Sequence, residues 1–179
     1  MTATNYIYND NLETNRLITR FLTANDVSSW TDFFRDKEAV EFLPMLGISS
    51  YEEKAKYWIE MQLNRYSENR FGLQAIIDKR TNMFIGQCGL LTQKVDGRIE
   101  IEVGYHILKK YWGQGFAPET AKLFIEYAFK NNISSSIISI IDKRNIKSQR
   151  VADKNGLICE KETKWLDREV YIYRINTKD

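Results

Sequence analysis

The segment that most constrains the fold is Ile99–Ala117, with the sequence IEIEVGYHILKKYWGQGFA. From Ile99 to Ile107 the odd positions are apolar, whereas the even positions carry glutamate, glycine and histidine. This period of two predicts a β-strand with one buried face. Gly113 and Gly115 then predict a tight turn, and Pro118 suits the first turn of a helix. The chain is therefore expected to pass from a strand through a glycine loop into a helix.

The glycine loop predicts an anion-binding site. Glycines leave the backbone N–H groups unobstructed, and the N-terminus of a helix attracts negative charge through its macrodipole. We therefore expect a phosphate-bearing ligand to bind here. On the glycines alone, a simple strand-to-helix connection that needs two glycines to turn is an equally good interpretation.

Length and composition limit the function classes. The 179 residues predict a single domain over residues 1–179, and 43% hydrophobic residues suffice for a packed core. The 26 basic and 24 acidic residues nearly balance, which argues against a nucleic-acid binder. No signal peptide and no apolar run of about 18 residues is found, so we expect a cytoplasmic protein without a membrane partner.

The cysteines and the histidine argue against a metal site. Cys88 and Cys159 lie in apolar, strand-like runs without metal-ligand spacing, so both are expected to be reduced and buried. His106 is the one histidine of the chain, which excludes a multi-histidine metal site. No metal is predicted.

The predicted element order is β-α-α-β-β-β-α-β-α-β-β, a mixed sheet flanked by helices. Asp96-Gly97 is a strong hairpin signal and makes the three central strands an antiparallel meander; a second hairpin turns at Asp167-Arg168. Strands are expected at 12–22, 71–78, 83–92, 98–108, 135–141, 157–165 and 170–176. Helices are expected after residues 23–26, at 51–66, from the glycine loop to about 130, and at 145–155.

Two nucleotide-binding classes fit the glycine loop poorly. The G-x-x-x-x-G-K-[ST] pattern of a P-loop is absent. Gly113-Gln114-Gly115 is half of a dinucleotide fingerprint, and Asp142 ends the next strand. However, Pro118 stands at the third glycine position and the preceding strand belongs to an antiparallel hairpin. A dinucleotide-dependent oxidoreductase remains an alternative that NAD(P) binding would support.

Two separated motifs resemble a known family. Lys110-x-x-Gly113-x-Gly115, after the strand Glu102-Val103-Gly104-Tyr105 and before Ala117, resembles motif A of the GNAT superfamily of N-acetyltransferases. The segment from Asn145 to Leu157, N-x-x-S-x-x-V-x-x-x-N-G-L, resembles the second signature of that family. The resemblance extends from about Leu12 to Asn176, and the subgroup it resembles most is the ribosomal-protein alanine or serine N-acetyltransferases.

The resemblance implies a fold and an activity. The fold is α/β (α+β), a mixed, mostly antiparallel sheet of roughly six or seven strands with about four helices, in which a splayed strand pair forms the acetyl-CoA slot. Acetyl-CoA is the implied co-substrate. The acetyl group is expected to pass directly, in a ternary complex, to a primary amine of a protein N-terminus or a small molecule. Edge strands in the last hairpin make a homodimer a further expectation.

The resemblance also implies cofactor-binding residues by position. Backbone N–H groups of the loop would hold the CoA pyrophosphate; they belong to Gly113, Gln114, Gly115, Phe116 and Ala117. Main-chain groups of the slot strand would pair with the pantetheine amides, at Val103, Tyr105, Ile107 and Leu108. Asn145 would hydrogen-bond the pantetheine arm or the backbone that positions it, and Ser148 would bind the sulfur region of the arm.

Two positions depart from the family pattern. The family usually has arginine or glutamine where Lys110 stands, and lysine lacks the planar fork. Many members carry a tyrosine as general acid where Ala152 stands, which leaves Ser148 as the candidate to protonate the leaving thiolate. A serine that satisfies the local backbone is the alternative. Tyr105 and Tyr111 are weaker candidates for the acid.

The candidate base is Glu102, on the polar face of the strand beside the proposed slot. A solvated strand residue is the alternative. Glu100 shares this face but is expected nearer to solvent, and His106 lies about 13 Å further along the strand, nearer to the phosphates. The apolar loop 42–48 is the expected acceptor wall. A protein of the same fold that binds acyl-CoA as a sensor, without catalysis, is the alternative function.

Overall fold

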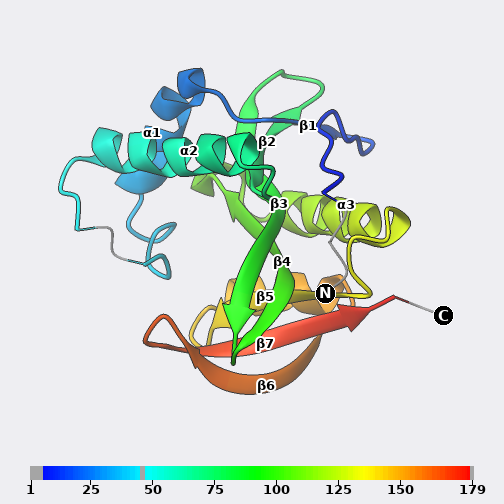
Figure 1. Cartoon of the computed structure of the whole chain (residues 1–179). Helices are drawn as coiled ribbons and strands as arrows, with labels where there is room; N and C mark the ends of the chain where they lie inside the picture. Colours follow the sequence, from blue (N-terminus) through cyan, green and yellow to red (C-terminus); the bar gives the residue numbers. More distant parts are fainter. Residues whose placement is uncertain (1–5, 45–46, 178–179) are drawn as a thin grey trace.

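The chain is built on one mixed sheet of seven strands in the order β1-β2-β3-β4-β5-β7-β6 (Figure 1). A computed structural model describes residues 6–44 and 47–177. The strands are β1 Leu17–Arg20, β2 Leu73–Asp78, β3 Phe84–Val95, β4 Arg98–Ile107, β5 Ser136–Asp142, β6 Ile158–Trp165 and β7 Arg168–Asn176. The helices are α1 Val27–Arg35, α2 Tyr51–Ser67, α3 Phe116–Lys130 and α4 Ile146–Lys154, with 3-10 turns η1 Ala24–Asp26 and η2 Lys109–Tyr111.

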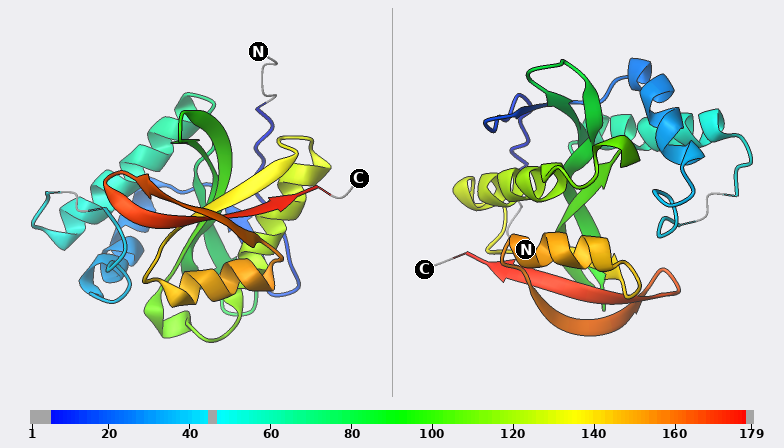
Figure 2. Two further views of the ribbon diagram at one scale, coloured as in Figure 1. Left: turned by 90° about the horizontal axis from the view of Figure 1, so that it is seen from below. Right: turned by 180° about the vertical axis from the view of Figure 1, so that it is seen from behind.

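Two apolar cores lie on opposite faces of this sheet, with α1 and α2 on one face and α3 and α4 on the other (Figure 2). On the first face, Trp30 of α1 is fully buried and stacks on Phe33 with ring centroids 4.2 Å apart. On the second face, Phe124 of α3 is fully buried. The apolar residues that recur at helical spacing along α1 and α3 therefore face the sheet.

The central meander is confirmed. Strands β2, β3 and β4 pair antiparallel in sequence order. Asp96 and Gly97 both have positive φ, of 48° and 80°, which is the backbone that a tight two-residue hairpin needs. The register that this turn sets places Glu102 of β4 opposite Leu91 of β3.

The sheet divides between β4 and β5. These strands run parallel and share the single register pair Glu102–Ile138 within the described residues, whereas every other strand pairing is antiparallel. Beyond that pair the two backbones separate, so their facing N–H and C=O groups have no ladder partners. This splayed pair is the slot expected from the resemblance.

Three local expectations are wrong. The first strand spans Leu17–Arg20 rather than 12–22, because the residues before it form a short turn with a bridge between Glu13 and Ile18. Ile99 is 68% exposed, because it lies near the hairpin tip beyond the core. The last hairpin turns at Leu166 and Asp167, which have positive φ, one residue earlier than expected.

The two cysteines differ in exposure. Cys88 of the central strand β3 is buried, as expected. Cys159 is exposed, contrary to expectation, because β6 is an edge strand whose outer residues have no covering layer. A homodimer through this edge stays a prediction. Within the described residues, no helix is long and apolar enough to cross a membrane.

Candidate active site

The glycine loop presents a set of unpaired backbone donors at the start of α3. Gly113 and Gly115 have φ of 75° and 80°, and Gly115 is the N-cap of this 15-residue helix. Within the described residues, none of the five N–H groups from Gly113 to Ala117 donates a hydrogen bond. A Cβ at Gly113 would meet nothing within 4 Å, so the loop opens outward. Clustered N–H donors at a helix N-terminus are the chemistry that binds a phosphate.

A cation from a distant segment lies at this loop. Arg16 donates from Nη1 to the carbonyl oxygen of Gln114 at 3.0 Å. Its guanidinium stacks 4.4 Å from the centroid of the Phe116 ring and forms an ion pair with Glu119. The Lys110 ammonium lies 5.1 Å from the centroid of the Tyr111 ring. Among the described residues, Arg16 is therefore the cation in direct contact with the loop, although no sequence motif marks it.

The main chain of β4 forms one wall of the slot. The carbonyl oxygen of Val103 accepts a hydrogen bond from Ser139 Oγ at 3.4 Å, and that of Ile107 accepts from Trp112 Nε1 at 2.7 Å. The N–H of Leu108 is turned to β3, where it donates to the carbonyl of Ile85 at 3.0 Å. Pantetheine pairing by Val103, Tyr105, Ile107 and Leu108 stays a prediction.

Glu102 is a buried carboxyl group at the point where the slot opens. Its residue is only 8% exposed. Oε2 accepts from Gln93 Nε2 at 2.7 Å, and Oε1 accepts from the N–H of Ile140 on β5 at 3.3 Å. Burial raises the pKa of Glu102 to about 7, and the two hydrogen bonds and the charge of Arg65 only partly oppose that rise. Near neutral pH both the acid and its conjugate base are therefore populated.

The neighbours of Glu102 on this face are unsuited to proton transfer. Glu100 forms a two-point ion pair with Arg174, at 2.9 and 3.0 Å, which lowers its pKa; this side chain is therefore engaged rather than free in solvent. His106 packs edge-on between Trp58 and Phe33, with centroid distances of 5.2 and 5.8 Å. Burial lowers the pKa of His106 to about 4, so it is neutral at pH 7.

Opposite walls of the slot meet at Tyr105 and Ser148. Asn145 is the N-cap of α4, and its Oδ1 accepts from the N–H of Ser148 at 3.1 Å. The Tyr105 hydroxyl of β4 donates to the carbonyl oxygen of Ser148 at 3.0 Å. Burial raises the pKa of Tyr105, against the smaller, lowering effect of the neighbouring Ser139 and Ser148 side chains. Asn145 thus orders the first turn of α4 and holds Ser148 beside a protonated phenol.

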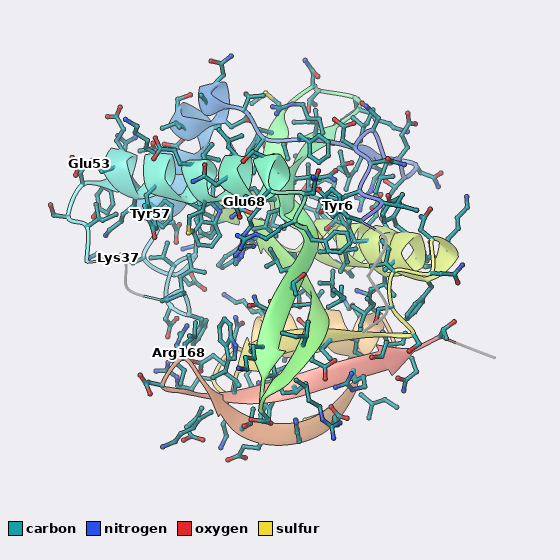
Figure 3. The ribbon with its side chains drawn as sticks, viewed as in Figure 1. Tyr6, Lys37, Glu53, Tyr57, Glu68 and Arg168 are labelled. Atoms are coloured by element: carbon teal, nitrogen blue, oxygen red, sulfur yellow. The ribbon has the colours of Figure 1, made fainter. Side chains whose placement is uncertain are left out.

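The loop between α1 and α2 contacts residues on the far side of the slot through a hydrogen bond and ion pairs. Its Phe42 carbonyl accepts a hydrogen bond from Arg168 of the β6–β7 hairpin. Figure 3 labels Arg168 at this hairpin. The guanidinium of Arg144 lies 5.4 Å from the centroid of the Phe42 ring. Glu38 pairs with Lys109, at 2.8 Å, and with Lys147 of α4. Met45 and Leu46 of the expected acceptor wall 42–48 lie outside the described residues, and the role of this loop stays a prediction.

Gln93 is a residue of the site that was not predicted but could have been identified from the hairpin register. Gln93 lies on β3 opposite Glu100, so it stands diagonally across from Glu102. The Asp96-Gly97 turn fixes that register, and counting back from it would have placed Gln93 beside the candidate base. Arg16 and Arg168 carried no such signal, because only tertiary packing brings their segments to the slot.

Comparisons with known proteins agree with this geometry. The model of the acetyltransferase (GNAT) domain matches residues 16–158. The uncharacterized N-acetyltransferase YoaA of Bacillus subtilis (strain 168) is 31% identical over 148 residues, which cover 81% of each chain. The uncharacterized N-acetyltransferase p20 of Bacillus licheniformis is 28% identical over 157 residues, which cover 86% of this chain and 84% of the relative.

Solved structures share the fold at low sequence identity. The ribosomal-protein-S5-alanine acetyltransferase of Vibrio fischeri has a TM-score of 0.73 at 18% identity, covering 93% of this chain and 96% of that one. RimL, a ribosomal L7/L12 alpha-N-protein acetyltransferase in complex with coenzyme A, has a TM-score of 0.75 at 13% identity, covering 94% and 98%. From the family match over most of its length, this chain is an N-acetyltransferase of the GNAT family.

Proposed function

We propose that this protein transfers an acetyl group from acetyl-CoA directly to the α-amino group of an acceptor, with Glu102 as the base. The observation that carries this proposal is a buried carboxyl group with a pKa of about 7 at the opening of the splayed strand pair. A base with a pKa near the working pH is the kind of group that removes a proton efficiently.

The glycine loop fits the phosphate end of acetyl-CoA. Its five unpaired N–H groups would hold the pyrophosphate, and Arg16 would add a positive charge at the same loop. Acetyl-CoA supplies an acetyl group activated as a thioester. The main chain of β4 after Glu102 would receive the pantetheine arm, because the divergence from β5 leaves that edge without a neighbouring strand.

The pKa of Glu102 favours an α-amine over a lysine side chain. Proton transfer from an α-ammonium group with a pKa of about 8 to a carboxylate of pKa about 7 is uphill by about 1.4 kcal/mol. The same transfer from a lysine with a pKa of about 10.4 is uphill by roughly 4.6 kcal/mol. The RimL neighbour is an alpha-N-protein acetyltransferase, which supports the same choice.

The opposite wall supplies the proton for the leaving thiolate. Ser148 is the acid candidate, and the Tyr105 hydroxyl fixes its position by donating a hydrogen bond to the Ser148 main-chain carbonyl. The raised pKa of Tyr105 keeps this phenol protonated across the physiological range. Ser148 thus forms the donor side of the slot, with Tyr105 positioning it, while Glu102 accepts the proton of the amine.

Direct transfer is favoured over a cysteine acyl-enzyme. Burial raises the pKa of Cys88 to about 12, so its thiol is not ionised near neutrality. Cys159 lies on β6, the edge strand that pairs with β7 rather than with the slot strands β4 and β5. We therefore expect the acceptor amine to attack the thioester while both substrates are bound.

A ligand comparison tests the proposal. Thermal unfolding is followed with acetyl-CoA, CoA, NAD(P) and ATP at matched concentrations; a ligand at about 100 times its Kd adds about 2.7 kcal/mol to the free energy of unfolding. Acetyl-CoA and CoA are expected to stabilise the protein, and acetyl transfer to a peptide α-amine should follow. A larger effect of NAD(P) would favour an oxidoreductase. CoA binding without transfer to any amine would favour an acyl-CoA sensor.

A further inference from the structure

Residues 36–42, which we call the strap, follow α1 and cross the mouth of the slot, where β4 and β5 end. Near the start of the strap, Glu38 forms an ion pair with Lys109, at 2.8 Å, and a second one with Lys147. Lys109 follows β4, and Lys147 lies in the first turn of α4, which follows β5. One carboxylate therefore joins the ends of the two strands that splay apart to form the slot.

The other end of the strap is held by a buried carboxylate. The Asp142 side chain, at the end of β5, is 7% exposed and pairs with Arg144, at 3.0 Å, and with Arg168, at 3.4 Å. These two guanidinium groups contact the ring and the carbonyl oxygen of Phe42, respectively. Within the described residues, Glu38 and Asp142 are the carboxylates that each pair with two cations. Both act on the strap, so its two ends are fixed across the slot.

The two anchors differ in their exposure to solvent. The side chains of Glu38, Lys109 and Lys147 are 43%, 47% and 63% exposed, so salt screens the attraction between them. The two ammonium groups lower the pKa of Glu38 to about 2, so its carboxylate is ionised at neutral pH. Asp142 is shielded by comparison. The Glu38 end of the strap is therefore the end that ionic strength weakens.

Lys147 is itself held against the β4 wall of the slot. Its ammonium lies 4.3 Å from the centroid of the Trp112 ring, directly before Gly113 of the glycine loop. Trp112 Nε1 in turn donates to the carbonyl oxygen of Ile107 at the end of β4, at 2.7 Å. The cation that Glu38 meets on α4 therefore has a fixed position, which gives the strap a defined place to dock.

We propose that Glu38 is a positioning residue that seats the strap across the slot and so keeps the acceptor wall in place for the amine. The inference rests on the proposed function, because the expected acceptor wall begins at Phe42, where the strap ends. When the strap is unseated, only the seated fraction of the protein binds the acceptor, and the apparent affinity falls by that fraction. The chemistry at Glu102 is unaltered, so Glu38 controls the KM for the amine rather than kcat.

Exchanging charges tests the inference. Glu38→Lys places a third ammonium group beside Lys109 and Lys147, and the KM for a peptide α-amine should rise about tenfold, with kcat within about twofold and CoA binding no weaker. Adding Lys147→Glu restores an opposite pair, and this double variant should recover most of the loss. Glu41→Lys is the control, because Glu41 is exposed on the same strap and forms no ion pair within the described residues.

Salt gives a readout that a purely packing role would not move. In the wild-type protein the KM for the amine should rise about threefold between about 0.05 M and about 0.5 M KCl. In Glu38→Gln it should be raised at the outset and respond less to salt. An unchanged KM in Glu38→Lys, no recovery in the double variant, or an equal rise in Glu41→Lys would overturn the inference and leave the proposed function in place.

Hydrogen exchange separates the two proposals, because it needs no turnover. The N–H groups of Ala39 and Val40 both bond to Asp36, so their exchange reports on the strap. With CoA present, exchange over residues 36–42 should be faster in Glu38→Lys than in the wild-type protein and slow again in the double variant. That pattern without acetylation of any amine supports seating by Glu38, and the proposed function then fails alone. Exchange that ignores Glu38→Lys, or faster exchange with an unchanged KM, would overturn the inference.

Discussion

The two ends of the slot are built in different ways. The proposed phosphate end is one continuous segment, Gly113–Ala117, and its donors are backbone N–H groups that any sequence with this turn would present. The proposed amine end gathers side chains from β3, β4 and the β6–β7 hairpin, represented by Gln93, Glu102 and Arg168. A cofactor shared by a family suits a backbone site, whereas an acceptor that varies between relatives suits a side-chain site.

The largest expected effect is a loss of activity without a loss of CoA binding, caused by a substitution at the amine end. Glu102→Gln removes the base but keeps the shape, so kcat/KM for an α-amine should fall by about 100-fold or more. The Kd for CoA should not change, because the glycine loop is intact. Steady-state rates and calorimetric CoA binding measure the two quantities. An unchanged kcat/KM would exclude Glu102 as the base.

The second prediction concerns a substitution in the glycine loop, which should weaken acetyl-CoA binding and leave the amine end unchanged. Gly115→Ala places a side chain at φ of 80°, a backbone that costs L-residues roughly 1–2 kcal/mol, and it adds a Cβ 3.5 Å from Arg16 Nη2. The KM for acetyl-CoA should rise about tenfold with little change in the KM for the amine. Gly97→Ala is the matched control, since it has the same φ in a hairpin remote from the loop. Equal effects of the two variants would contradict a cofactor role.

The pH profile sharpens the description of the amine end. Glu102 must be ionised to act as the base, and its pKa is about 7, so kcat/KM should rise with pH through about 7. Gln93 lowers that pKa through its 2.7 Å hydrogen bond. In Gln93→Leu the pKa of Glu102 should rise, and the acid limb should move to higher pH by roughly half a unit to one unit. A lower rate with an unmoved limb would assign Gln93 to packing alone.

The smallest expected effect tests whether the phosphate end is only backbone. Arg16→Gln removes the guanidinium that contacts the Gln114 carbonyl, and the Kd for CoA should rise severalfold. Glu119→Gln is the control, because it breaks the ion pair with Arg16 but leaves the guanidinium at the loop. Weaker CoA binding in Glu119→Gln alone would show that the ion pair stabilises the loop and that Arg16 adds no charge to the site.

The contrast between a site built from one segment and a site built from several elements also explains which features could be predicted from the sequence. The strand, the glycine turn and the helix of Ile99–Ala117 were predicted from sequence, because alternation, glycine and helix capping act over a few neighbouring residues. Glu102 was selected as the candidate base for the same local reason, its place on the polar face of that strand. Its rival His106 could not be dismissed, since the aromatic rings that bury it belong to α1 and α2.

Local sequence therefore determined the element order, the central meander and the glycine turn that opens α3. Only the tertiary structure decided the burial of Glu102 and the exposure of Ile99 and Cys159, because burial depends on which layers cover a residue and on how far they reach. It likewise decided that Gln93 and Arg65 act on the charge of Glu102. Solvation and Coulomb energies depend on distances in space, which separation along the chain does not set.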